Sequence, residues 1–114
     1  MKIAITSAGR TLDSQVDQLF GRAAYFVIVD TETMDFNVIE NDSVAAASGV
    51  GISAAKAVVD AGAEAVLTGN CGPNAHRTLN AAGVELYNDV AGTVKEAIES
   101  FRSGKLTTAA SPNV

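Results

Sequence analysis

The stretch AYFVIVDTETMDFNVIE, residues 24–40, decides the fold of this chain. Its first part, Ala24–Asp30, is rich in β-branched and aromatic residues and predicts a strand. TETMD is a turn, and Phe36–Glu40 is again extended in character. A connection this short joins only antiparallel strands, so we expect the two segments to form a hairpin.

After the hairpin, helices alternate with strands. A helix is expected from about 52 to 61, with an apolar stripe of Ile52, Ala55, Val58 and Val59. Gly62 supplies its left-handed end. A strand follows at 65–68, and Pro73 begins a second helix at the position where a missing N–H costs nothing. The inner stripe of that helix is Ala75, Leu79 and Ala82.

The remaining elements complete an α/β pattern. Gly83 precedes a strand at 84–87, and a final amphipathic helix is marked by Val94, Ala97, Ile98 and Phe101 and closed by Gly104. Near the start, 2–6 is a strand, followed by a polar loop, residues 7–22, in which SQVDQLF, residues 14–20, is too short to specify more than a helical turn. Right-handed helical crossovers make strands 36–40, 65–68 and 84–87 parallel. We therefore expect a mixed five-stranded sheet with flanking helices in one domain, 1–104, followed by a flexible C-terminal tail, 105–114.

Composition excludes several classes of protein. The 114 residues have a net charge of −5 and no basic run, which makes a nucleic-acid partner a poor candidate. One cysteine cannot form an internal disulfide, and MKIAITS turns polar too early for a signal peptide. The apolar runs are too short to cross a bilayer. We expect a cytoplasmic protein without membrane contact, either a monomer or a homodimer.

The glycine-rich loops predict a binding site. If strand 2–6 lies parallel between strands 24–30 and 65–68, the loops 7–10, 20–23, 48–51 and 69–74 all meet at one edge of the sheet. Two of them enter helix N-termini, which favour an anion, and two arginines add positive charge. The candidate binding residues of this cradle are Ser7, Arg10, Gly21, Arg22, Gly49, Gly51, Gly69, Asn70, Gly72 and Asn74.

The only cysteine and the only histidine, Cys71 and His76, lie in the same loop and helix start. A thiolate suits iron, copper or molybdenum–sulfur species, and a helix N-terminus lowers a thiol pKa, so both residues are candidate metal ligands. The alternative is a small buried cysteine in a turn and a half-exposed histidine. One thiolate cannot hold a conventional iron–sulfur cluster, so the cargo would be a preassembled anionic cluster or a dimer would share ligands.

Other functions receive weaker support from the residues. The pattern G-x-G-x-x-A, Gly49–Ala54, is a relaxed dinucleotide fingerprint without the strand that should precede it. Nuclease chemistry needs clustered carboxylates, and the first strand has none. A cysteine-dependent enzyme would pair Cys71 with His76, but no third residue is evident to orient the histidine.

Several ordered motifs resemble one known family. MKIAI, FGRA before a strand, a Ser/Gly-rich loop entering a helix, G-x-x-GPNA and GV-x-LY are similar to the dinitrogenase iron–molybdenum cofactor biosynthesis family, from Met1 to about Gly104. This family includes nitrogenase cofactor carriers and a protein that holds a molybdenum–copper–sulfur cluster. The resemblance implies a ribonuclease H-like fold and the binding of an iron-, molybdenum- or copper-containing metal–sulfur cluster.

Two positions depart from the family pattern. Members often have a histidine directly before the FGR phenylalanine, where this chain has Leu19, and Cys71 is not a motif position. The resulting hypothesis is a small non-enzymatic carrier that takes a cluster or its precursor from a donor protein or passes it to an acceptor. The alternative is a regulatory or interaction module that binds a phosphate-bearing ligand in the same cradle.

Overall fold

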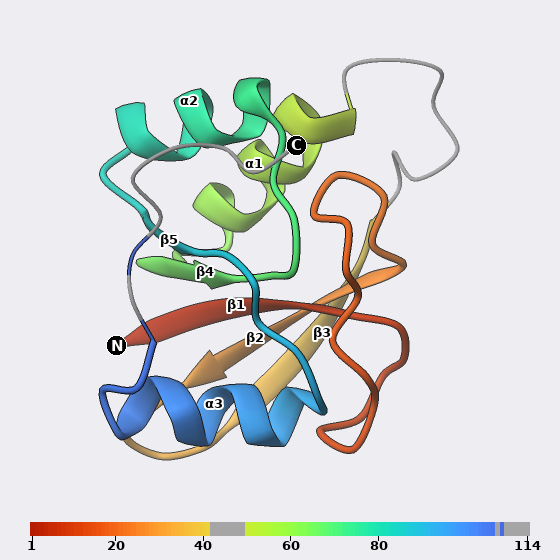
Figure 1. Ribbon diagram of the computed structural model, residues 1–114, viewed down its shortest axis with the longest axis vertical. Helices are drawn as coiled ribbons and strands as arrows, with labels where there is room; N and C mark the ends of the chain where they lie inside the picture. The colour runs from red at the N-terminus through yellow and green to blue at the C-terminus, as the bar shows by residue number, and fades with distance from the viewer. Residues whose placement is uncertain (42–49, 107, 109–114) are drawn as a thin grey trace.

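The computed structural model of the protein describes residues 1–41, 50–106 and 108 (Figure 1). In chain order, the described elements are β1 (Lys2–Ser7), β2 (Tyr25–Asp30), β3 (Phe36–Glu40), α1 (Val50–Asp60), β4 (Ala65–Leu67), α2 (Pro73–Ala81), β5 (Glu85–Tyr87) and α3 (Val94–Arg102). The predicted order of strands and helices is confirmed, with boundaries that shift by one or two residues.

The five strands form one mixed sheet in the order β3-β2-β1-β4-β5. Strand β2 is antiparallel to both β3 and β1, whereas β1, β4 and β5 are parallel to one another. The hairpin at 24–40 is therefore confirmed, as is the position of the first strand between the second and the fourth. The ribonuclease H-like label for this sheet stays a prediction.

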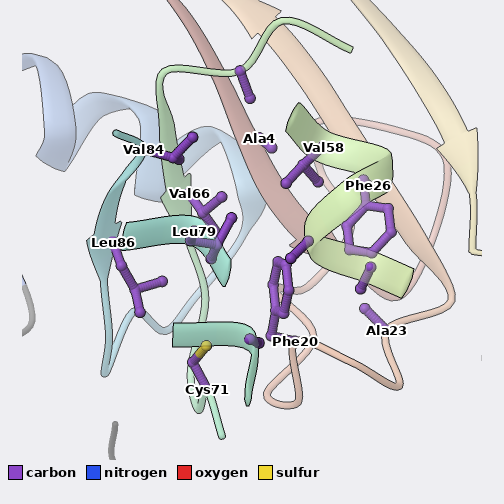
Figure 2. Close-up of a cluster of buried hydrophobic side chains, with 14 of the residues drawn as sticks. Ala4, Phe20, Ala23, Phe26, Val58, Val66, Cys71, Leu79, Val84 and Leu86 are labelled. Atoms are coloured by element: carbon purple, nitrogen blue, oxygen red, sulfur yellow. The ribbon is translucent and has the colours of Figure 1, made fainter. Parts of the chain in front are cut away.

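Helices cover both faces of the sheet, with α1 and α2 on one side and α3 on the other (Figure 1). Successive side chains of a strand point to opposite faces, so β1 contributes Ala4 to one core and Ile3 and Ile5 to the other. The core under α1 and α2 is built around Phe20, Phe26, Val58 and Leu79, as Figure 2 shows. Two layers of helix around a sheet leave the loops at the strand ends free to form a site.

The polar loop at 7–22 is confirmed, and two local predictions are wrong. Residues 14–20 are not helical: Val16 forms an isolated bridge with Ser7, and its N–H donates to Gly92 O over 2.9 Å. Partners distant in sequence thus satisfy the backbone of this loop. Ile52 is 38% exposed, because the smaller Ala54 takes the inward position of α1 beside Ala55 and Val58. Ala82 is exposed as well, since it is the C-cap of α2 rather than a residue of its inner stripe.

The helix ends follow the sequence closely. Gly62, Gly83 and Gly104 all have positive φ values, of 85°, 76° and 72°, as expected for residues that end helices. None of the described helices is long and apolar enough to cross a membrane. Most of the segment 105–114 lies outside the described residues, and its separation as a flexible tail stays a prediction.

Candidate functional site

A cavity of about 300 Å³ opens at the carboxyl ends of the parallel strands. Three segments far apart in the sequence form its walls: the loop after β1, the first turn of α1 and the loop that leads from β4 into α2. The lining residues are Leu19, Phe20, Gly21, Arg22, Gly51, Ile52, Asn70, Gly72, Pro73, Asn74 and Ala75. Six of the predicted binding residues are among them: Gly21, Arg22, Gly51, Asn70, Gly72 and Asn74.

The N-terminus of α2 contributes hydrogen-bond donors to this cavity. Gly72 is the N-cap, has an extended backbone with φ −74° and ψ 171°, and provides no side-chain cap. Pro73 has no N–H, and the first paired amide of the helix is His76 N–H, which donates to Gly72 O over 3.0 Å. Within the described part of the chain, the amides of Asn74 and Ala75 therefore keep their donors available.

The first turn of α1 packs directly on the first turn of α2. A Cβ atom at Gly51 would lie 3.3 Å from Ala75 Cβ and 3.5 Å from Ala75 N, a tight approach that glycine accommodates without displacing either turn. Neither helix has an acidic residue in its first turn. Two helix N-termini thus meet at one cavity without a carboxylate from their own first turns.

Hydrogen bonds join the loop after β1 to the loop after β4. Asn70 N–H donates to Gln18 O over 2.6 Å, Asn70 Nδ2 donates to the same carbonyl over 3.0 Å, and Phe20 N–H donates to Asn70 O over 3.0 Å. Gly69 is buried behind this contact, where a Cβ atom would lie 2.8 Å from Gln18 Cα. Gly69 therefore supports the site through close packing but does not line it.

Two polar side chains that we did not single out hold the other end of the loop after β1. Buried Asn41 donates through Nδ2 to Gly21 O over 3.0 Å and to Ala23 O over 2.9 Å. Asp17 accepts from the backbone N–H groups of Leu19, over 3.3 Å, and Ala24, over 3.4 Å. The FGRA segment is therefore fixed at both ends, and the only sequence signal for this was the presence of Asp and Asn next to tight loops.

The two arginines of the predicted cradle have different surroundings. Arg22 is exposed and lines the cavity. Arg10 forms an ion pair with Glu40, and its guanidinium lies 4.8 Å from the centre of the Tyr25 ring. Arg10 does not line the cavity, so the charge expected from it is directed to the end of the β2–β3 hairpin.

Two further predicted residues lie elsewhere. Ser7 is buried at the end of β1, where its Oγ donates to Gly9 O over 2.7 Å and accepts from Gly9 N–H over 3.2 Å. The residue closes a local turn instead of facing the cavity. Gly49, and with it most of the loop 48–51 and the relaxed dinucleotide fingerprint, lies outside the described residues.

Cys71 lies in the hydrophobic core and not in the cavity. Its side chain is 0% exposed and belongs to the cluster under α1 and α2, where Figure 2 shows it with Leu79 and Leu86. Burial raises the pKa of the thiol from 9.0 to about 11. The lowered thiol pKa that we expected from the helix N-terminus is therefore wrong, because desolvation outweighs that effect, and the alternative of a small buried cysteine describes this residue.

His76 does not share a site with Cys71. It is half-buried and lines a different cavity, formed by α2, β5 and Thr108, together with Asn80 and Glu85. Among the described residues, no group of three or more His, Cys, Asp or Glu side chains could hold a metal ion. The structure therefore does not assemble the predicted pair of metal ligands, nor the nucleophile and base of a cysteine-dependent enzyme.

These features define a small α/β protein with one compact cavity at the carboxyl ends of its parallel strands, bordered by two helix N-termini and an arginine. The sequence places it within a known group. The chain belongs to the dinitrogenase iron-molybdenum cofactor family, which matches residues 1–104.

Solved structures and one curated relative agree with this assignment. The apo form of the orange protein from Desulfovibrio gigas is 42% identical, with a TM-score of 0.97 over 99% of this chain and 96% of that one. A putative NifB protein from Thermotoga is 41% identical, with a TM-score of 0.86 over 99% and 97%. An uncharacterised protein of Methanocaldococcus jannaschii is 30% identical over 93% of this chain and 89% of its own length. The chain is thus a small protein of a cofactor-associated family.

Proposed function

We propose that this protein is a non-enzymatic carrier or scaffold that holds an anionic metal–sulfur cluster, or its precursor, as cargo in the cavity at the carboxyl ends of the parallel strands. The observation on which this rests is the set of donors around the cavity. It consists of the backbone amides of Asn74 and Ala75, the side-chain amide of Asn74 and the guanidinium of Arg22.

Such donors suit the outside of a preformed cluster better than a bare metal ion. N–H groups and a guanidinium donate hydrogen bonds to sulfide or oxide ligands, and they cannot replace those ligands on the metal. A volume of about 300 Å³ lies at the small end of ligand cavities, which fits a compact inorganic anion. The cargo would therefore arrive assembled from a donor protein and leave intact for an acceptor.

In this proposal Cys71 and His76 are not metal ligands. The thiol is enclosed in the core with a raised pKa, and the imidazole lines another cavity. Leu19 replaces the histidine that family members often have before the FGR phenylalanine, and it lines the cavity with an exposed aliphatic side chain. The cargo is consequently bound without a protein–metal bond, by charge, hydrogen bonds and apolar contact.

The test is the state of the protein purified without oxygen. The proposal predicts that protein from cells supplied with iron, molybdenum and copper contains a metal–sulfur chromophore, or takes up tetrathiomolybdate in about equimolar amount. Metal analysis and an absorption spectrum measure both. A phosphate-bearing ligand instead of metal and sulfide would support the regulatory alternative and contradict the carrier.

A further inference from the structure

The cavity has an apolar rim that the donors alone do not explain. Four large apolar side chains are exposed among the described residues, namely Met1, Leu19, Phe36 and Ile52, and two of these line the cavity. Leu19 is 47% exposed and Ile52 is 38% exposed. Their concentration at one hollow, beside Pro73 and Ala75, indicates that they contact what the hollow binds.

Leu19 and Ile52 come from different elements that are both held in place. Leu19 lies between the two residues that pair with Asn70, and its own N–H donates to Asp17 over 3.3 Å. Ile52 is in the first turn of α1, one residue after Gly51, which packs on Ala75. The aliphatic pair is thus fixed beside the donors at the N-terminus of α2.

An apolar wall next to hydrogen-bond donors discriminates between anions by hydration. An ion that enters the cavity loses water on the side of Leu19 and Ile52, and the cost of that loss is largest for small oxygen ligands with concentrated charge. Oxyanions such as phosphate and sulfate are strongly hydrated in water. Sulfide ligands are larger and more weakly hydrated. They therefore lose less hydration free energy on entering the cavity, and they gain van der Waals contact with the aliphatic carbons.

We propose that Leu19 and Ile52 are specificity-determining residues that make the cavity select sulfide-bearing anions over oxyanions of the same shape and charge. The inference rests on the proposed function, since it concerns the cargo of the same cavity. It predicts that phosphate and molybdate, the kind of anion that any open helix N-terminus accepts, compete poorly with the cargo.

Tetrathiomolybdate and molybdate form a matched pair of probes, because both are tetrahedral dianions of the same metal and differ only in sulfur against oxygen. Their affinities are measured by anaerobic calorimetry for the unchanged protein and for the double variant Leu19→Gln, Ile52→Gln. We expect the unchanged protein to bind tetrathiomolybdate at least about tenfold more tightly, a difference of ~1.4 kcal/mol. In the double variant this ratio falls by about fivefold or more, through weaker binding of the thioanion, while molybdate binding is maintained.

Phe36→Gln is the control, because Phe36 is 44% exposed on β3 and does not line this cavity. It should leave the ratio unchanged. Equal affinities in the unchanged protein, or an unchanged ratio in the double variant, would overturn the inference and leave the anion site in place. Binding of neither anion would overturn the proposed function together with the inference.

Discussion

The N-termini of α2 and α3 differ in whether side chains of the protein cap their first backbone amides. At α3, Thr93 Oγ1 accepts from Glu96 N–H over 3.1 Å and Glu96 Oε1 accepts from Thr93 N–H over 2.9 Å, a complete capping box. The backbone N–H of Thr93 lowers the pKa of Glu96. At α2, Gly72 offers no side chain, and the helix has no acidic residue in its first turn.

The difference separates a helix end that is structural from one that is available to a ligand. The first amides of α3 are occupied within the chain, so that end has no remaining attraction for an anion. The amides of Asn74 and Ala75 have no such partner among the described residues, and both residues line a cavity next to the first turn of α1 and Arg22. A helix end left open in this way is stabilised when an anion binds there. Five predictions test this contrast.

The largest effect concerns Cys71, which directly precedes the open end of α2 but lies in the core. A pKa of about 11 in place of 9.0 leaves roughly a hundredfold less thiolate at neutral pH, and the thiolate is the reactive form. We expect alkylation of the native protein to be at least about a hundredfold slower than that of the urea-unfolded chain, with iodoacetamide and mass spectrometry as the measurement. Equal rates would show that the thiol faces solvent and the cavity.

The same shift predicts a dependence of stability on alkaline pH. The folded protein favours the neutral thiol, so the contribution of Cys71 is fully present below pH 9 and is lost as the pH rises toward 11. Urea unfolding curves of the unchanged protein and of Cys71→Ala should therefore converge between neutral pH and pH ~10.5. A constant difference between the two curves over this range would contradict the raised pKa.

The next effect comes from giving the N-terminus of α2 a side-chain cap, as the N-terminus of α3 already has. Gly72→Asp places a good N-cap on an extended backbone, and its carboxylate occupies the amides and repels anions. We expect tetrathiomolybdate affinity to fall by about thirtyfold, roughly the net value of one charge-assisted hydrogen bond, while the melting temperature is maintained or rises. Gly72→Ala, which adds a methyl group without a cap or charge, is the control and should retain most of the affinity. Unchanged binding in the aspartate variant would show that this helix end does not hold the anion.

A smaller effect on anion affinity is expected from replacing Arg22, and replacing Arg10 is the matched comparison. Arg22→Ala removes a charge-assisted donor that lines the cavity and should weaken tetrathiomolybdate binding by about tenfold, with a reduced dependence on salt. Arg10→Ala removes the same charge at a position paired with Glu40, outside the cavity, and should change affinity by less than about twofold. Equal losses for both variants would indicate long-range attraction in place of local contact. Calorimetry at two ionic strengths separates these cases.

The smallest effect on binding is expected at the closed helix end. Thr93→Ala removes one half of the capping box and should destabilise the protein by about 1 kcal/mol in urea unfolding. Anion affinity should be unaffected, because the amides so released belong to α3, which covers the other face of the sheet (Figure 1). A gain or loss of anion binding in Thr93→Ala would mean that the two helix ends are not independent.

The fold was predictable where local pattern determines structure. The alternation and composition of 24–40 specify the hairpin, and Pro73, Gly62, Gly83 and Gly104 mark helix ends through their own backbone preferences. The loop 14–20 was not predictable in this way. Its helical appearance is overridden by pairing with Ser7, Thr93 and Asn70, which are distant in sequence or belong to other elements.

The site was predictable to the level of which loops meet, but not to the level of each side chain. Gly51, Asn70, Gly72 and Asn74 line the cavity because strand direction fixes where their loops emerge. Cys71 does not, because alternate residues of an extended loop face opposite ways and the core receives this one. A further set depends on contacts that no local pattern encodes: the pairing of Arg10 with Glu40 and the anchoring of Gly21 and Ala23 by Asn41.

The central claim is that a preformed anionic cluster is held by the open end of α2 and Arg22, without bonds from Cys71 or His76. The most direct measurement is retention of metal and sulfide after anaerobic gel filtration, compared among Cys71→Ser, His76→Ala, Arg22→Ala and Gly72→Asp. The account predicts near-normal retention in the first two variants and a large loss in the last two. Complete loss in Cys71→Ser and His76→Ala, with normal retention in Arg22→Ala and Gly72→Asp, would contradict it.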